Sequence, residues 1–328
     1  MQTFTGTEYL QIDIANQFGL DRLEWDKRIW WVKDNIGDLK DLDSTAKHPI
    51  LFRKAYRALK EVIAGRSTNH LMGLDATASG IQIMAAMSGC HRAAKAVNLI
   101  DTGQREDLYD DVALNMTKLV DIPVDRERMK KPVMTFFYGS QAVPKQVFGD
   151  GQALVCFFNS MLETLPGPYK LMQLFQRFWD GNATEYTWVL PDGHVAKIPV
   201  TSTEEKGMEI DEENHLRFHY RAQVIKPQSQ GKALAANIVH SVDGWVCREM
   251  VKRAAAQGFW LAPIHDCFYA SPNNMNQVRL NYRDIMVELS QMNLVAQILS
   301  SIRKQSLTYR KLSTDLHIKI SSSEYALS

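Results

Sequence analysis

The sequence has few cysteines, no long apolar run and almost no net charge, and each absence excludes a class of protein. The four cysteines form no C-x-x-C pair, which argues against a zinc site. No apolar run approaches the ~20 residues of a membrane span. Glu8 and Asp13 stand where a signal peptide needs a basic and then an apolar start. We therefore expect reduced thiols, a cytosolic protein and no membrane partner.

The net charge of +1 at pH 7 is a mild objection to nucleic-acid binding, because phosphate contacts leave a basic footprint. The charges are unevenly distributed, however. Four cations crowd between Arg126 and Lys131, whereas acidic residues gather over 204–213. The composition argues against strong independent DNA binding but is compatible with a channel that has basic walls.

The pattern of apolar residues predicts a helix-rich chain with a few short strands. Its 328 residues suggest about two domains, and no internal repeat is present. A short apolar strand at 71–74 runs directly into Asp75. The expected helices cover 25–36, 50–63, 79–87, 107–120, 126–138, 169–179 and 233–256.

Two further segments are typical of hairpins. In one, a turn at 191–193 joins two strands, and a strand at 216–224 alternates apolar with largely basic residues. We expect this strand to pair with 195–200, with the acidic stretch 204–213 as the tip between them. In the other, residues 259–271 turn at His265-Asp266 between two strands that look buried.

Three short segments, far apart in the sequence, carry the residues that one catalytic site would need. They are 75–82, reading D-A-T-A-S-G-I-Q, 126–139, reading R-E-R-M-K-K-P-V-M-T-F-F-Y-G, and 264–267, reading I-H-D-C. Phosphoryl transfer by two metal ions needs carboxylates from separate elements converging on ions about 3.5–4 Å apart, and cations that hold a triphosphate. Asp75 and Asp266 can supply the carboxylates, and residues 126 and 130 the cations.

In this order, the three segments resemble motifs A, B and C of the single-subunit RNA polymerases of phages and mitochondria. The resemblance covers almost the whole chain. It includes 6–36, 95–99, 106–109, 188–193, 237–241 and the ending at 324–328.

The resemblance implies a DNA-directed RNA polymerase that transfers nucleotides from NTPs along a DNA template to an RNA product. It implies an α/β (α+β) right-hand fold. Residues 71–91 and 241–328 would form the palm, and 92–240 the fingers with the hairpin at 195–225. A helical segment at 1–70 would lie beside the palm.

The resemblance also assigns roles to single residues. Asp75, the main-chain carbonyl of Ala76 and Asp266 would bind two Mg²⁺ ions. Catalytic roles fall to Asp75, Asp266, Lys130 and Tyr138. Nucleotide contacts fall to Arg126, Lys130, Met134, Tyr138, Gly139, His240 and Tyr109, with Tyr138 near the sugar and the templating base. Nucleic-acid contacts fall to Arg217, Arg221 and His265.

More ordinary interpretations stand beside these roles. Asp75 could be a helix N-cap, and Asp266 a turn aspartate with local hydrogen bonds. The cations at 126 and 130 could form a solvated helix face. His240 could be a structural histidine and Tyr109 a core residue, and Arg92 carries no distinguishing pattern.

Two departures and two rival functions follow from the motifs. Many family members have glycine at the position of Ala76 and serine at that of Cys267.

A family A DNA polymerase typically has glutamate in motif A and after the motif C aspartate, which this chain lacks, so RNA polymerase is favoured. A non-catalytic nucleic-acid-binding or assembly subunit with the same fold is the second rival.

The chain shows no match to the family's N-terminal domain, thumb or D-x-x-G-R segment. We expect the catalytic chain of a split, two-chain phage enzyme, although a processed product or a truncation would look the same. A second polypeptide would then carry the missing parts, in the cytoplasm of an infected bacterium. Trp25, Trp30 and Trp31 are expected to be available for that heterodimer interface.

Overall fold

The computed structural model describes residues 1–120, 123–137, 139–211, 215–229, 231 and 233–328. Its elements are many helices and small antiparallel sheets, as expected for an α+β protein. The helices are α1 (Gly6–Ala15), α2 (Trp25–Asp34), α3 (Pro49–Ile63), α4 (Ser79–Ser88), α5 (His91–Ala96), α6 (Leu108–Val120), α7 (Arg126–Phe136), α8 (Ala142–Phe148), α9 (Gln152–Thr164), α10 (Pro166–Arg177), α11 (Ala233–Ala256), α12 (Met275–Gln291), α13 (Leu294–Arg303) and α14 (Leu316–Ile320). The strands are β1 (Met72–Asp75), β2 (Glu185–Val189), β3 (Val195–Pro199), β4 (Thr201–Ile210), β5 (Leu216–Ile225), β6 (Ala262–Ile264) and β7 (Cys267–Ala270).

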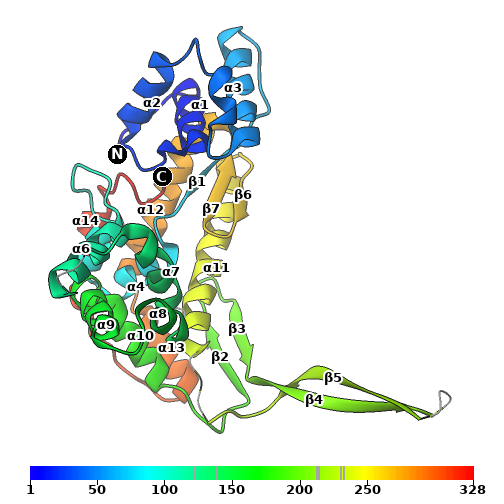
Figure 1. Cartoon of the computed structure of the whole chain (residues 1–328). Helices are drawn as coiled ribbons and strands as arrows, with labels where there is room; N and C mark the ends of the chain where they lie inside the picture. Colours follow the sequence, from blue (N-terminus) through cyan, green and yellow to red (C-terminus); the bar gives the residue numbers. More distant parts are fainter. Residues whose placement is uncertain (121–122, 138, 212–214, 230, 232) are drawn as a thin grey trace.

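The first three helices form a unit at one end of the molecule (Figure 1). Thr5 caps α1 and forms a capping box with Glu8, which pairs two main-chain donors at the helix start. The three helices bury their own apolar cluster, which includes Leu10, Val32 and Phe52. Three α-helices thus lie within the segment expected to be helical, between Gly6 and Ile63.

The tryptophans of this unit differ in their surroundings. Trp25 is fully buried and stacks on Tyr325, with ring centroids 5.4 Å apart. Trp31 is half-buried against Phe18, whereas 65% of Trp30 is exposed. The expectation that all three are available for an interface is therefore wrong for Trp25, because the C-terminal segment covers it.

A three-stranded antiparallel sheet in the order β1-β7-β6 joins distant parts of the chain. The turn between β6 and β7 falls at His265-Asp266, as predicted. The expectation that both strands of this hairpin are buried is wrong in part. Phe268 is buried, whereas Trp260 and Ile264 are 62% and 59% exposed. Helices α4, α11 and α12 pack together beside the sheet.

A long two-stranded ribbon of β4 and β5 projects from the body as an arm (Figure 1). We expected β5 to pair with 195–200 and the acidic stretch to be the tip. Instead, β3 pairs with β2 across the predicted turn at 191–193, and β5 pairs with β4. Residues 204–210 of the acidic stretch are therefore strand, and two of their acids, Glu205 and Glu209, face Arg221 and Arg217 across the ribbon.

The C-terminal segment 325–328 lies against the start of α4 and the end of β1. The main chains of Asp75 and Ser328 hydrogen-bond to each other, and Thr77 N–H donates to the Ala326 carbonyl. The side chain of Gln82, fully buried, donates to the carbonyls of Val97 at 2.8 Å and Ala326 at 2.9 Å. Its oxygen accepts from the Tyr282 hydroxyl.

Among the described residues, no single helix is long and apolar enough to cross a membrane. The helical stretches Pro272–Gln291 and Leu294–Arg303 reach the required length and composition only as a pair bent by 59°.

Replacing Gln82 tests the link between α4, α12 and the C-terminal segment. Gln82→Met keeps the side-chain volume but removes the donor to the Val97 carbonyl, one of two donors to the Ala326 carbonyl and the acceptor for the Tyr282 hydroxyl, so we expect it to lower the free energy of unfolding by about 2–4 kcal/mol. Urea unfolding measures the change. Gln305→Met, at an exposed position, is the matched control. A loss in Gln82→Met no larger than in the control would contradict this role.

Candidate active site

Pairing of β1 with β7 brings Asp75 and Asp266 to the same edge of the sheet. Asp75 ends β1 opposite Cys267, and Ala76 N–H donates to the Asp266 main-chain carbonyl at 3.0 Å. The tight turn before β7 is possible because His265 adopts a left-handed conformation, with φ of 56°. Two carboxylates that are distant in the sequence are thus neighbours in space.

The electrostatic setting of these carboxylates favours a bound cation. The Asp75 side chain is open to water, yet the surrounding protein raises its pKa to about 6, and the charge of Asp266 adds to this rise. Within the described residues, the Asp266 carboxylate makes no hydrogen bond or ion pair. The residues therefore fit a divalent cation, which binds carboxylate oxygens.

The ordinary interpretations of both aspartates are not supported. The N-cap position of α4 is taken by Ala78, in a left-handed conformation with φ of 55°, so Asp75 does not cap that helix. In the described part of the chain, Asp266 has no local hydrogen bond of the kind that explains a turn aspartate.

A third carboxylate, Asp243 on α11, was missed by the sequence analysis. Burial raises its pKa to about 6, with a further contribution from Asp266, while a hydrogen bond with Ser79 acts in the opposite direction. Asp243 lies one helical turn after His240. This i, i+3 spacing places the two on one helix face and was the available signal.

Two thiols also border the carboxylates. Burial raises the pKa of Cys267 to about 12, and Asp75 adds to the rise. Burial raises the pKa of Cys247 to about 11, and Asp243 contributes. Because the thiolate is the reactive form, neither cysteine should react readily with thiol reagents at neutral pH.

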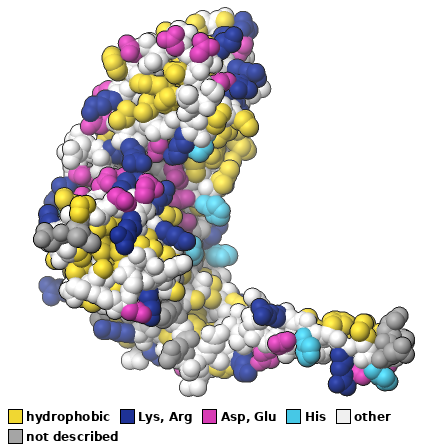
Figure 2. Space-filling view, viewed as in Figure 1, with side chains coloured by type: hydrophobic (Ala, Val, Ile, Leu, Met, Phe, Trp, Pro, Cys, Tyr) yellow, Lys and Arg dark blue, Asp and Glu magenta, His cyan; other side chains and the backbone are white. Residues whose placement is uncertain are grey.

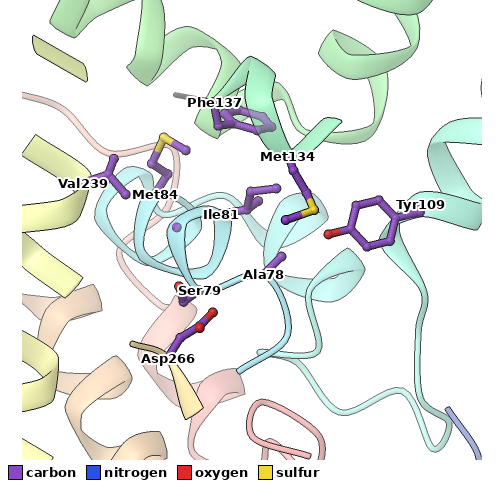
Figure 3. A pocket seen from close by; sticks show the side chains of 10 residues that line it. Ala78, Ser79, Ile81, Met84, Tyr109, Met134, Phe137, Val239 and Asp266 are labelled. Atoms are coloured by element: carbon purple, nitrogen blue, oxygen red, sulfur yellow. The ribbon is translucent and has the colours of Figure 1, made fainter. Parts of the chain in front are cut away.

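A cavity of about 80 Å³ joins Asp266 to helices α4, α6 and α7. Figure 3 shows Met134 and Tyr109 on one side of this cavity and Asp266 on the other, beyond Ser79. Phe137, which the sequence analysis did not single out, lines the same space. Tyr109 and Met134 thus line the same cavity as Asp266, a candidate metal ligand.

The two basic residues of α7 differ in their contacts. Arg126 Nε donates to Asp107 Oδ2 at 2.7 Å, and its guanidinium lies 5.0 Å from the centre of the Tyr109 ring. Lys130 is exposed and has no ion pair within the described residues. Arg126 is therefore held in place beside Tyr109, while the Lys130 ammonium is available to a ligand.

The end of motif B is described only in part. Gly139 is buried with φ of 82° and donates its N–H to the Phe136 carbonyl, so it has a structural reason to be glycine. Tyr138 lies outside the described residues, and its expected place at the sugar stays a prediction.

The remaining predicted residues fall into two groups. His240 and His265 both lie at the surface. Partial removal from water by the surrounding protein lowers the pKa of His240, and the nearby charge of His265 lowers it further. Figure 2 shows acidic and histidine side chains together along the inner edge of the concave side. Arg217 and Arg221 lie on β5 in the projecting arm, so the structure does not bring them to the carboxylates.

Comparison with known proteins gives one consistent result. The family model described as DNA-dependent RNA polymerase matches residues 2–148 and 173–326. DNA-directed RNA polymerase 3, chloroplastic, of Nicotiana sylvestris is 24% identical over 91% of this chain and 36% of its own length. The DNA-directed RNA polymerase of Pseudomonas phage phiKMV is 20% identical over 87% of this chain and 42% of its own length. The chain thus spans well under half the length of these curated relatives.

Replacing Asp75 tests the electrostatic strain at the site. Because its folded-state pKa is raised from 3.8 to about 6, ionisation costs stability as pH rises through this window. In EDTA, Asp75→Asn should raise the midpoint of thermal unfolding relative to wild type at pH 8 but not at pH 4. Added Mg²⁺ should stabilise wild type more than the variant.

Calorimetry at both pH values measures these differences. Asp34→Asn, at an exposed position on α2, is the control for loss of one charge. Equal effects of Asp75→Asn at pH 4 and pH 8, or equal stabilisation of both proteins by Mg²⁺, would contradict the assignment.

Proposed function

The chain belongs to the DNA-dependent RNA polymerase family, and on that premise we propose that it carries the catalytic centre for template-directed RNA synthesis. The reaction is attack of a 3′-hydroxyl on the α-phosphate of an NTP, which breaks the bond to the leaving pyrophosphate. The observation that supports this most is the placement of Asp75 and Asp266 side by side, with a cavity that extends from Asp266 to α7.

The chain's own residues would divide the work as follows. Asp75, the Ala76 carbonyl and Asp266 would hold two Mg²⁺ ions, which when bound lower the pKa of the attacking hydroxyl and neutralise the triphosphate. Lys130 would bind the phosphates and stabilise their charge. Arg126, fixed by Asp107, would hold one side of the nucleotide site.

We propose the right-hand division of the chain on the same basis. Residues 71–91 and 241–328 would form the palm, because β1 and β7 pair in one sheet although the intervening chain is long. Residues 92–240 would form the fingers, with α7 facing the cavity and the arm of β4 and β5 at the outer end.

We also propose that a second polypeptide contacts the helical unit at 1–70. The support is apolar surface on α2 and just beyond it, where Trp30 and Ile36 are 65% and 43% exposed. A phage origin and a place in the bacterial cytoplasm stay predictions.

Replacing the motif C aspartate tests the catalytic role against the rival of a non-catalytic subunit. Asp266→Asn should reduce single-nucleotide extension of a primed template in Mg²⁺ by at least about 10³-fold, because the cations lose a charged ligand. Asp101→Asn, at an exposed position outside the 1–70 unit and the three motifs, should extend normally. Near-normal extension by Asp266→Asn, or no extension by wild type with its required partner chain, would refute the proposal.

The charge of the arm generates a prediction about templates. Residues 201–226 contain six acidic residues and four Lys or Arg. Two of the four cations already pair with acids, as Arg217 does with Glu209 and Lys226 with Glu204, both at 2.8 Å. Because duplex binding depends on free cations, we expect the purified chain to use single-stranded or pre-opened template far better than a linear duplex.

Run-off transcription from matched duplex and bubble templates measures this preference. The double variant Glu205→Gln/Glu209→Gln should reduce the difference in transcript yield between bubble and duplex templates, since each change removes a charge that repels phosphate. Efficient, sequence-specific initiation by the unmodified chain on linear duplex would show that the arm binds DNA unaided.

A further inference from the structure

The strongest concentration of positive charge in the chain lies on and around α3, outside the catalytic motifs. Residues 47–66 contain six Lys or Arg and one acid, a net charge of +5, whereas the whole chain carries only +1. The remaining residues therefore sum to −4. One helix and its flanks thus carry a local excess of positive charge, while the rest of the chain is acidic on balance.

The burial pattern of α3 turns these cations toward an open groove. Phe52, Ala55 and Leu59 are buried in the cluster of the 1–70 unit. The opposite face lines a groove of about 530 Å³. Its lining residues are Ile50, Arg53, Lys54, Arg57, Ala58, Glu61, Thr68, Asn69 and His70.

Two of the groove's cations are available to a ligand. Arg53 is paired with Asp43 at 2.7 Å, and Glu61 is paired with Arg66. Lys54 and Arg57 are exposed and have no ion pair within the described ranges. They stand three residues apart, so they lie on the same helix face, opposite the polar segment 68–69.

The groove is connected to the candidate active site by a short piece of chain. Its wall at Thr68 and Asn69 leads directly into β1, which ends at Asp75. Six residues of extended chain span at most about 20 Å. A strand of nucleic acid in the catalytic cleft could therefore continue into the groove.

We propose that the groove beside α3 binds the sugar–phosphate backbone of a nucleic-acid strand that enters or leaves the catalytic cleft. The proposal rests on the proposed function for the identity of that strand. Lys54 and Arg57 supply charge to phosphates, and Thr68 and Asn69 supply hydrogen-bond donors. Figure 2 shows Lys and Arg side chains gathered over α3.

The shape and chemistry of the groove favour nucleic acid over a lipid surface. Lipid-surface helices present a broad apolar face with cations at its border. Here the exposed apolar side chains are Ile50 and Leu51 at the start of α3 and Ile63 at its end, which are 81%, 47% and 65% exposed. The cations between these ends line a concave groove. An extended polyanion fits this arrangement.

The double variant Lys54→Gln/Arg57→Gln tests the proposal in the full chain. Fluorescence anisotropy in EDTA measures binding of labelled single-stranded DNA, single-stranded RNA and an RNA–DNA hybrid, without catalysis. We expect weaker binding of at least one probe, with the slope of log K against log salt reduced by roughly 2, one unit for each lost phosphate contact. The probe most affected identifies the strand.

A matched control removes the same charges elsewhere. Lys170→Gln/Arg177→Gln changes one exposed Lys and one exposed Arg on α10, and the slope should stay at the wild-type value. The groove proposal is overturned if the α3 variant keeps the wild-type slope for all three probes, or if it loses affinity only for vesicles of anionic phospholipid.

A second readout separates this proposal from the proposed function. At saturating primed template, the α3 variant should add a single nucleotide at the wild-type rate, because neither residue is part of the catalytic centre. One outcome is that the α3 variant reduces the salt dependence of nucleic-acid binding, while neither wild type nor variant extends a primer. The groove proposal is then supported and the polymerase proposal fails. If extension is normal and the slope is unchanged, the polymerase proposal stands and the groove proposal fails.

Discussion

The catalytic proposal depends on one structural constraint, the antiparallel pairing of β1 with β7. A main-chain hydrogen bond from Ala76 to Asp266 fixes the two strand ends side by side. The pKa of Asp75 is raised to about 6, first because the surrounding protein removes its carboxyl in part from water and then because the charge of Asp266 lies nearby. A divalent cation between the two carboxylates would offset the electrostatic repulsion that results from this strand pairing.

Much of the fold could be predicted from the sequence, because helices and turns depend on local patterns. The turn at His265-Asp266 and the long helix α11 lie where the apolar periodicity placed them. Strand pairing was harder. Alternation identifies a strand but not its partner, so β5 was paired with the wrong segment, and the acids of β4 looked like a loop. The burial of Trp25 was not predicted because its covering residue, Tyr325, comes from the far end of the chain.

The sequence identified the candidate-site residues that lie in short motifs. It missed the residue that only tertiary packing brings to the site. Asp75, Asp266, Met134 and Tyr109 come from recognisable segments, and the structure places them around one edge of the sheet and its cavity. Asp243 sits in the middle of a long helix, where its i, i+3 spacing from His240 was the one signal in the sequence. It joins the candidate site only because α11 packs beside the sheet, where burial and the nearby charge of Asp266 raise its pKa.

The central claim is that Asp75 and Asp266 together form a metal centre, and diffraction from crystals soaked in Mn²⁺ tests it most directly. Anomalous scattering locates the ions without reference to activity. The account predicts peaks within coordination distance of both carboxylates, about 3.5–4 Å apart if two ions are bound. Anomalous peaks elsewhere in the chain, with none between Asp75 and Asp266 at saturating Mn²⁺ and bound nucleotide, would contradict it.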